Sequence, residues 1–293
     1  MLNKKIIPIL ILLVAVLSLS CVGASDNVTC NDNDDYLASA VNESDVLADN
    51  PKTFTDLNSL INDNTNTRIT LECDYEFSKI SDSQLSNGIL IDRSISIYGN
   101  GHTIDAKNQA RIFNVTSYVN FYNIFFINAN SDSGSAITGT NYYVSGCSFI
   151  NNHADRMGGA MCGGFAQNST FKDNSAPRWG GAVYQGSIEN CTFISNSAEQ
   201  GGALYNTYAT ISTFIRNTAG LYGGAMYGSS VGNSVFIQNS AKSHAGAVFN
   251  AYVVNCNFTN NTAPNGGALG GEEYSAQNCI FEYNSADDGG AMY

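Results

Sequence analysis

The chain has 293 residues, of which 43% are hydrophobic and 13% charged. Its 25 acidic side chains outnumber 13 lysines and arginines, which gives a formal net charge of −12. So acidic a chain lacks the basic surface that nucleic acids require, and this excludes them as expected partners.

The first 24 residues have the pattern of a secretory signal peptide. Two lysines precede an apolar run, residues 6–19, and small residues follow it, so we expect cleavage after Ala24. The run is too short for a stable membrane span. A lipoprotein signal through Cys21 is the alternative, but Ser18 stands where an aliphatic residue is expected. Cleavage removes two of the 13 basic residues and no acidic ones, and the formal charge becomes −14.

Residues 25–50 are acidic and poor in large apolar side chains, which predicts a mobile, disordered leader. An acidic run of this kind can bind calcium, but this one lacks the spaced ligands and the glycine of an EF-hand loop. We interpret it as a solvated linker.

Residues 51–63 predict a short helix that Thr55 is placed to cap. Its apolar face is formed by Phe54, Leu57, Leu60 and Ile61. A solenoid has to cover the open end of its core, and we expect this helix to do so.

Residues 64–146 contain segments of alternating apolar and polar residues, which predict the strands of about three irregular coils. The last of these carries Phe125 and Asn128 at the spacing of the repeats that follow. We expect residues 64–293 to form one continuous domain.

Residues 147–293 hold seven copies of a repeat such as CTFISNSAEQGGALY. The phenylalanines that mark the copies are separated by 22, 22, 21, 22, 22 and 23 residues: Phe149, Phe171, Phe193, Phe214, Phe236, Phe258 and Phe281. A fixed step in this range indicates a solenoid. Apolar positions alternate inside each copy, which is the period of a strand and not of a helix. The sequence therefore predicts an all-β, parallel β-helix solenoid with about 22 residues per coil.

Stacked coils lie about 4.8 Å apart, so each residue meets the equivalent residue of the next coil. Phenylalanines then form an aromatic column in the core. An asparagine ladder is expected where the strand gives way to a turn, since side-chain amides can bond to each other and Asn tolerates left-handed backbone. Its members are Asn152, Asn174, Asn196, Asn217, Asn239, Asn261 and Asn284. A Gly-Gly pair supplies another corner of each coil. We interpret all these residues as scaffold.

The outside of the solenoid has to supply any binding surface. Two residues after the repeat alanine an aromatic residue occurs in most copies, next to an aliphatic residue that we place in the core. These aromatic residues are Tyr184, Tyr205, Tyr227, Phe249 and Tyr293. They predict a stripe that can lie against sugar rings or an apolar partner. The alternative is that tyrosine simply suits an exposed strand.

Seven of the eight cysteines follow the signal segment, an odd number for an exported chain. Four of them stand two residues before the repeat phenylalanine, where other copies have serine, so we predict a buried slot for small residues. Only Cys256 and Cys279 lie in neighbouring coils at a spacing that permits a disulfide, and parallel strands seldom give the required angles. Without CxxC spacing, no metal site is expected.

Seven Asn-x-Ser/Thr sequons mark possible glycosylation sites. They begin at Asn27, Asn42, Asn114, Asn168, Asn190, Asn257 and Asn260. Occupancy at Asn190 and Asn257, which flank the core strand, requires outward side chains.

An enzyme on this fold needs carboxylates or basic residues gathered on one outer face. The three histidines, His102, His153 and His244, are far apart in coil number. Acidic residues occur as adjacent pairs in turns, at residues 272–273 and 287–288. We therefore predict no catalytic residues and no cofactor, and keep a polysaccharide lyase or glycoside hydrolase as the alternative.

The GGA[ILV] and FxxN motifs resemble the repeats of chlamydial polymorphic outer membrane proteins. Together with IYGNGHTIDAKNQARIFNV, they resemble more closely the large right-handed β-helix adhesin-like proteins of methanogenic archaea. The resemblance covers roughly residues 51–293. It implies a right-handed, pectin lyase-like β-helix in a secreted or cell-envelope protein that mediates attachment. The sequence stops midway round the seventh coil, and we expect a fragment of a longer surface protein, associated with the envelope through a region outside this chain.

The function expected from the sequence is that of an adhesin-like rod at the cell surface. Its predicted partners are surface glycans or proteins of a host or neighbouring cell. A passive envelope stalk is a further alternative, which has no ligand.

Overall fold

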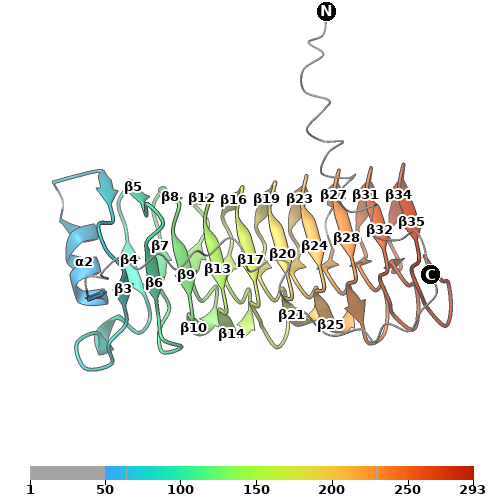
Figure 1. Ribbon diagram of the computed structural model, residues 1–293, viewed down its shortest axis with the longest axis horizontal. Coiled ribbons are helices and arrows are strands. Elements are labelled where there is room, and N and C mark those ends of the chain that lie inside the picture. Colours follow the sequence, from blue (N-terminus) through green and yellow to red (C-terminus); the bar gives the residue numbers. More distant parts are fainter. Residues whose placement is uncertain (1–49, 64, 229) are drawn as a thin grey trace, which may run out of the picture. The chain divides into compact units, whose positions relative to one another are not determined.

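The computed structural model describes residues 50–63, 65–228 and 230–293. The predicted signal peptide and nearly all of the predicted leader lie outside these residues, as do the sequons at Asn27 and Asn42. Three long parallel sheets of 11, 10 and 9 strands run side by side along one axis, and most coils contribute one short strand to each (Figure 1). The parallel β-solenoid of about ten turns is thereby confirmed. Its right-handed sense stays a prediction.

Sheet A contains the strands with the repeat phenylalanine. Its strands in order are β1 (Lys52–Thr53), β3 (Tyr75–Glu76), β6 (Thr103–Asp105), β9 (Phe125–Ile127), β13 (Ser148–Ile150), β17 (Thr170–Lys172), β20 (Thr192–Ile194), β24 (Thr213–Ile215), β28 (Val235–Ile237), β32 (Asn257–Thr259) and β35 (Ile280–Glu282).

Sheet B precedes sheet A in each coil. Its strands are β2 (Arg68–Thr70), β5 (Ile95–Tyr98), β8 (Val119–Tyr122), β12 (Tyr142–Ser145), β16 (Phe165–Gln167), β19 (Ser187–Glu189), β23 (Tyr208–Thr210), β27 (Ser230–Gly232), β31 (Tyr252–Val254) and β34 (Ser275–Gln277).

Sheet C follows the glycine pair. Its strands are β4 (Ile89–Ile91), β7 (Phe113–Val115), β11 (Ile137–Gly139), β15 (Met161–Cys162), β18 (Val183–Tyr184), β22 (Leu204–Tyr205), β26 (Met226–Tyr227), β30 (Val248–Phe249) and β33 (Leu269–Gly270). Between sheets A and C lie two smaller groups, β10 (Asn130–Ser133) with β14 (His153–Met157), and β21 (Ser197–Gln200) with β25 (Thr218–Tyr222) and β29 (Ser240–Ala241). A 3-10 helix, η1, spans Ser83–Leu85.

The helix α2 (Phe54–Asn62) packs at the N-terminal end of the stack (Figure 1). Phe54, Leu57 and Ile61 are fully buried and belong to the core. Leu60 was predicted on the same face, but it is 37% exposed. The predicted cap was also wrong: Thr53 is the N-cap, in a capping box with Asp56. Thr55 instead lies in the first turn, where its hydroxyl donates to Asp82 at 2.7 Å.

A column of phenylalanines fills the core behind sheet A. Consecutive rings from Phe126 to Phe281 are stacked with centroids 4.6 to 5.0 Å apart, close to the spacing of the coils. The column corrects one detail of the sequence alignment. Phe126 pairs with Phe149, whereas Phe125 faces outward, because a shift of one residue along a strand exchanges its two faces.

The asparagine ladder is buried beside this column. The backbone N–H and the Nδ2 of Asn174 both donate to Oδ1 of Asn196 in the next coil, at 3.0 Å. Nδ2 also donates to the Phe149 carbonyl of the preceding coil at 3.0 Å. The same contacts recur along the ladder to Asn284. Each inner amide, such as that of Asn196, therefore accepts two hydrogen bonds from the preceding asparagine and donates two, to a phenylalanine carbonyl and to the next asparagine.

Left-handed residues turn the chain at the corners of a coil. Asn190, Ser195, Gly201 and Asn206 have φ between 48° and 64°. The ladder asparagines are not among the left-handed residues, although the sequence had given that role to them. The residue directly before each one, such as Ser195, takes the left-handed conformation instead. The ladder amide is thereby free to point into the core.

The two glycines of each pair have different roles. The first, such as Gly201, is left-handed, and Ala245 adopts the same conformation with φ 58° in the one copy that lacks this glycine. A Cβ on the second, such as Gly202, would collide with the carbonyl oxygens of Gly224 and Thr218. Close approach of successive coils therefore requires the second glycine.

We predict that Gly224→Ala destabilises the protein far more than Gly223→Ala. The second position meets backbone carbonyls of the neighbouring coil, and overpacking of this kind costs about 3 kcal/mol. A Cβ at the first position would meet the Met226 carbonyl oxygen of its own coil. Ala245 nevertheless occupies the equivalent position of the next copy with φ 58°, so we expect Gly223→Ala to cost only about 1 kcal/mol. Urea unfolding followed by circular dichroism gives both values, and equal losses would contradict the distinction.

We also predict that Asn196→Ala lowers the free energy of unfolding by about 3 kcal/mol, because two donors of Asn174 and the Phe171 carbonyl lose their partner. Asn257→Ala is the matched control, since this asparagine is exposed on β32. It is expected to change the free energy by less than about 0.5 kcal/mol. Denaturant titration of both variants measures the difference, and similar losses would rule out the ladder as a source of stability.

Candidate binding surface

Four of the five predicted aromatic residues form a stacked column on the outside of sheet C. Tyr184 and Tyr205 have ring centroids 5.7 Å apart, Tyr205 and Tyr227 4.9 Å, and Tyr227 and Phe249 5.3 Å. The aliphatic residue before each of them is buried, as the alternation requires. The column therefore runs without a break through four coils.

A second column lies beside the first and was not predicted. It consists of the residues directly before the glycine pair, which pair from coil to coil: Met157, Trp179, Gln200, Tyr222, His244, Asn265 and Asp288. The Trp179 ring lies 5.7 Å from that of Tyr205, and the Tyr222 ring 4.8 Å from that of Phe249. The sequence held a signal, because two aromatic residues and a histidine share this repeat position.

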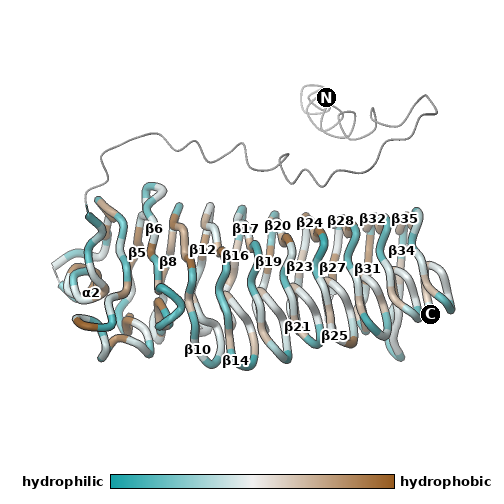
Figure 2. Tube along the Cα trace, turned by 60° about the horizontal axis from the view of Figure 1, so that its bottom comes forward, coloured by the Kyte–Doolittle hydropathy of each residue, from teal (hydrophilic) through white to brown (hydrophobic). Residues whose placement is uncertain are grey.

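We define the aromatic face as the aromatic residues of both columns over these coils. Its members are Trp179, Tyr184, Tyr205, Tyr222, Tyr227 and Phe249. Figure 2 shows hydrophobic and hydrophilic stretches interspersed along the coils. Buried and more exposed residues alternate along the strands, and on these coils part of the outward set is aromatic.

The orientation of the rings limits what the aromatic face can bind. Rings whose centroids lie 4.9 Å apart with an interplanar angle of 10° would overlap if they lay flat on the sheet, so Tyr205 and Tyr227 turn their faces toward each other. Outward, they present ring edges and hydroxyl groups. Burial raises the pKa of Tyr205, and the neighbouring Tyr227 adds to the shift, so its hydroxyl stays a donor.

The column is interrupted at Gly270, which leaves a gap between Phe249 and Tyr293. A pocket of about 260 Å³ opens there, lined by Tyr222, His244, Phe249, Gly271, Glu272 and Tyr293. Tyr293 does not continue the stack, and its ring meets that of His244 edge-on at 5.8 Å. Ring faces are therefore accessible at this interruption, whereas inside the column they are covered.

The three histidines are not brought together. Nδ1 of His102 lies 3.1 Å from Asp74, that of His153 2.9 Å from Ser175, and that of His244 2.7 Å from the neighbouring Ser243. In the described ranges no three His, Cys, Asp or Glu side chains are grouped closely enough to hold a metal ion. Both acidic pairs, residues 272–273 and 287–288, are exposed.

The cysteine slot is part of a second buried ladder, which lies at the start of sheet A. The Cys147 N–H donates to Oγ of Ser169, the Ser169 N–H to Sγ of Cys191, and the Cys191 N–H to Oγ of Ser212. Cys256 and Cys279 are both free thiols. Thiol and hydroxyl groups therefore serve as acceptors in the same column, alternating from Cys147 to Ser212 and followed by a second serine, Ser234.

The sequons of the repeats lie at exposed positions. Asn168 and Asn190 are exposed left-handed corner residues, and Nδ2 of Asn190 donates to Oδ1 of Asn168 at 2.7 Å. Asn257 and Asn260 are exposed as well, whereas Asn114 is partly buried on β7. A glycan at Asn190 would be attached to the same Nδ2 that donates to Asn168. Glycosylation of these sites stays a prediction.

The solenoid and its outward columns place the chain among β-solenoid repeat proteins. A sequence model of the Chlamydia polymorphic membrane protein repeat matches residues 168–185 and 190–207. Each match runs from a corner asparagine through the ladder asparagine and glycine pair to just past an outward tyrosine, Tyr184 or Tyr205. No curated protein and no solved structure matches the chain. Within the described part of the chain, no helix has the length and apolar character needed to cross a membrane.

The buried thiols predict a loss of stability in alkaline solution. Burial raises the pKa of Cys147 and Cys191 from 9.0 to about 12. The unfolded chain ionises these thiols above pH 9 while the folded protein keeps them protonated, so the free energy of unfolding falls by about 1.4 kcal/mol per pH unit and thiol between pH 9 and 12. Cys191→Ser, which copies the residue of neighbouring coils, should make the fall shallower. Denaturant titrations at pH 8, 9 and 10 under reducing conditions measure it, and an unchanged slope would refute the assignment.

Proposed function

We propose that the chain is the repeat region of a secreted, cell-surface attachment protein that binds glycans or proteins of neighbouring cells through its aromatic face. The match to a polymorphic membrane protein repeat supports a surface location. The observation that carries the proposal is the aromatic face itself, whose two columns bring six aromatic residues to one side of the solenoid.

The chemistry of this face favours polar ligands with apolar patches. Edges of tyrosine rings and their hydroxyl groups can donate to sugar oxygens, while the gap at Gly270 offers the faces of Phe249 and Tyr293 to a single inserted ring. The rigid stack holds these groups at fixed spacing, so a ligand that binds several coils loses little entropy to ordering of the protein.

The matched repeat also bears on the enzymatic alternative. Its description is that of a membrane protein, and it names no reaction. An attachment protein retains a polysaccharide without cleaving it, a hydrolase or lyase releases fragments, and a passive stalk does neither. One assay therefore separates the three.

We expect the purified chain to be retained on one or more surface polysaccharides of a host or microbial panel, without release of sugar fragments. Combined Tyr205→Ser and Tyr227→Ser substitutions remove the centre of the aromatic face and should lower the affinity roughly tenfold. Tyr118→Ser is the control, since this tyrosine is 58% exposed outside the face. Undiminished retention of the double variant would contradict the aromatic face, fragments would favour an enzyme, and no retention of the unaltered chain would favour a stalk.

A further inference from the structure

A different pair of tyrosines lies on the outer face of sheet B. The register of β19, β23, β27, β31 and β34 aligns one outward position of each strand. That position holds Ser187, Tyr208, Ser230, Tyr252 and Ser275 in turn. Tyrosine and serine thus alternate from coil to coil, and Tyr208 and Tyr252 are 63% and 61% exposed. They are among the most exposed large side chains of the described solenoid.

Alternation with serine leaves the ring faces of this pair uncovered, whereas rings in the aromatic face cover one another. A tyrosine of the stacked column has a ring on the next coil, whereas Tyr208 and Tyr252 have serines there, and in the described residues neither ring stacks on another aromatic ring. Their spacing is two coils, roughly 9.6 Å. Both rings therefore keep free faces at a fixed separation along the solenoid axis.

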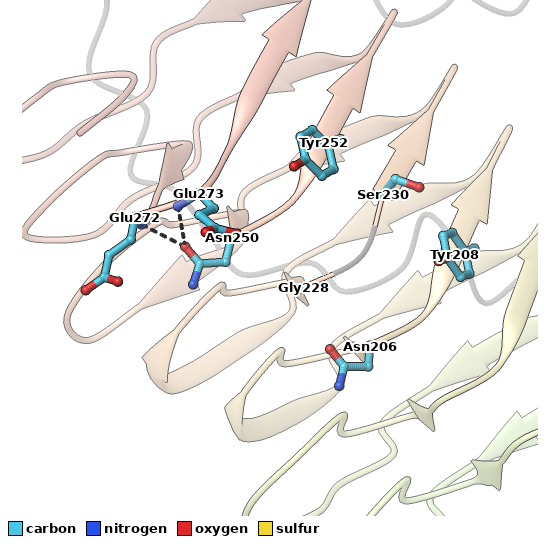
Figure 3. Close-up of a pocket in the computed structure, with 8 residues that line it drawn as sticks. All are labelled: Asn206, Tyr208, Gly228, Ser230, Asn250, Tyr252, Glu272 and Glu273. Atoms are coloured by element: carbon cyan, nitrogen blue, oxygen red, sulfur yellow. Dashed lines mark hydrogen bonds between the residues drawn. The ribbon is translucent and has the colours of Figure 1, made fainter.

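A pocket of about 410 Å³ joins the two tyrosines (Figure 3). Figure 3 shows Ser230 on the strand between them, with Asn206 and Asn250 at the nearby corner of their coils. Oδ1 of Asn250 accepts the N–H groups of Glu272 at 2.8 Å and Glu273 at 3.4 Å, which fixes the acidic corner of the next coil at the rim.

The residues that line the pocket determine which class of ligand it can bind. Two exposed aromatic rings with hydroxyl, amide and carboxylate groups between and beside them can pack on sugar rings and bond to their hydroxyl groups. Neither lysine nor arginine lines this pocket, and two glutamates do, so an acidic sugar would meet like charges. A neutral saccharide fits both features.

The distance between the Tyr208 and Tyr252 rings determines which ligand geometry fits the pocket. In an extended β-1,4-linked chain, alternate sugars face the same way and repeat over about the distance between Tyr208 and Tyr252. Such a chain can place one sugar on each ring and pass over Ser230 with the sugar between them. A chain that curves, as α-1,4-linked glucose does, cannot keep both contacts.

We propose that Tyr208 and Tyr252 form a second binding site, which holds an extended, uncharged β-1,4-linked polysaccharide along the solenoid axis. Alternate sugars pack on the two rings, and the sugar between them lies over Ser230. Asn206, Asn250 and the glutamate corner bond to hydroxyl groups at its edge. The site goes beyond the proposed function, because it does not use the aromatic face.

The test is calorimetric titration of the purified chain with a hexasaccharide and a disaccharide of β-1,4-linked glucose. We expect the hexasaccharide to bind at least tenfold more tightly, because only the longer ligand reaches both rings. Tyr208→Ala and Tyr252→Ala should each lower hexasaccharide affinity roughly tenfold, while the control Tyr118→Ala leaves it unchanged. Equal affinity for both ligands, or for an α-1,4-linked hexasaccharide, would overturn the proposal.

Ser230→Tyr gives a sharper test. It adds a ring on the intermediate coil, where stacking would cover the faces of Tyr208 and Tyr252, so we expect affinity to fall although aromatic surface is added. A rise in affinity would show nonspecific apolar binding and overturn the site.

The combined Tyr205→Ser and Tyr227→Ser variant separates this site from the proposed function. It should keep hexasaccharide binding if the sheet B pair is the site. Loss of binding in that variant, with Tyr208→Ala unaffected, would overturn the sheet B site and leave the aromatic face standing. Failure of the unaltered chain to bind the hexasaccharide would overturn the sheet B site alone, because attachment through the aromatic face is measured on the polysaccharide panel.

Discussion

Close stacking of the coils is the constraint on which the rest of the structure depends. Backbone hydrogen bonds between parallel strands hold successive coils about 4.8 Å apart. The second glycine of each pair permits this approach, because any Cβ there would meet a carbonyl of the next coil. The inner asparagines then supply partners for the polar groups that the turn leaves inside. The distance between coils and the hydrogen bonding of their buried polar groups thus depend on a few positions of the repeat, the second glycine and the ladder asparagine.

Because the coils stack, equivalent residues of successive coils line up in columns, and each column has its own chemical role. A phenylalanine column forms the core, an asparagine column satisfies buried polar groups, and a column of serines and cysteines begins sheet A. In an uninterrupted aromatic column each ring covers its neighbour, which contributes stability and leaves edges outside. Ring faces become available only where the column is broken, as at Gly270 and at the serines that separate Tyr208 from Tyr252. Regular repeats build the scaffold, and departures from the repeat create sites.

The sequence by itself determined the solenoid, the coil length and the assignment of most residues to the inside or outside. The reason is physical: a repeat of fixed length made of alternating residues has few ways to bury its apolar face other than stacking on its copies. The same pattern identified the asparagine ladder positions and the first aromatic column. It failed where the repeat is irregular, because nothing in the pattern distinguishes Phe125 from Phe126 until the strand register is known.

Only the tertiary structure decided how the outward side chains meet. The residue before the glycine pair joins the aromatic face because the corner folds it beside sheet C, a proximity that spacing along the chain does not reveal. The directions of the rings follow from packing between coils. The column was predicted to lie against sugar rings, but it presents ring edges to a ligand. The tyrosine pair of sheet B was visible as two residues in the sequence. Their alternation with serine along one outer column, and the pocket between them, exist only in the folded stack.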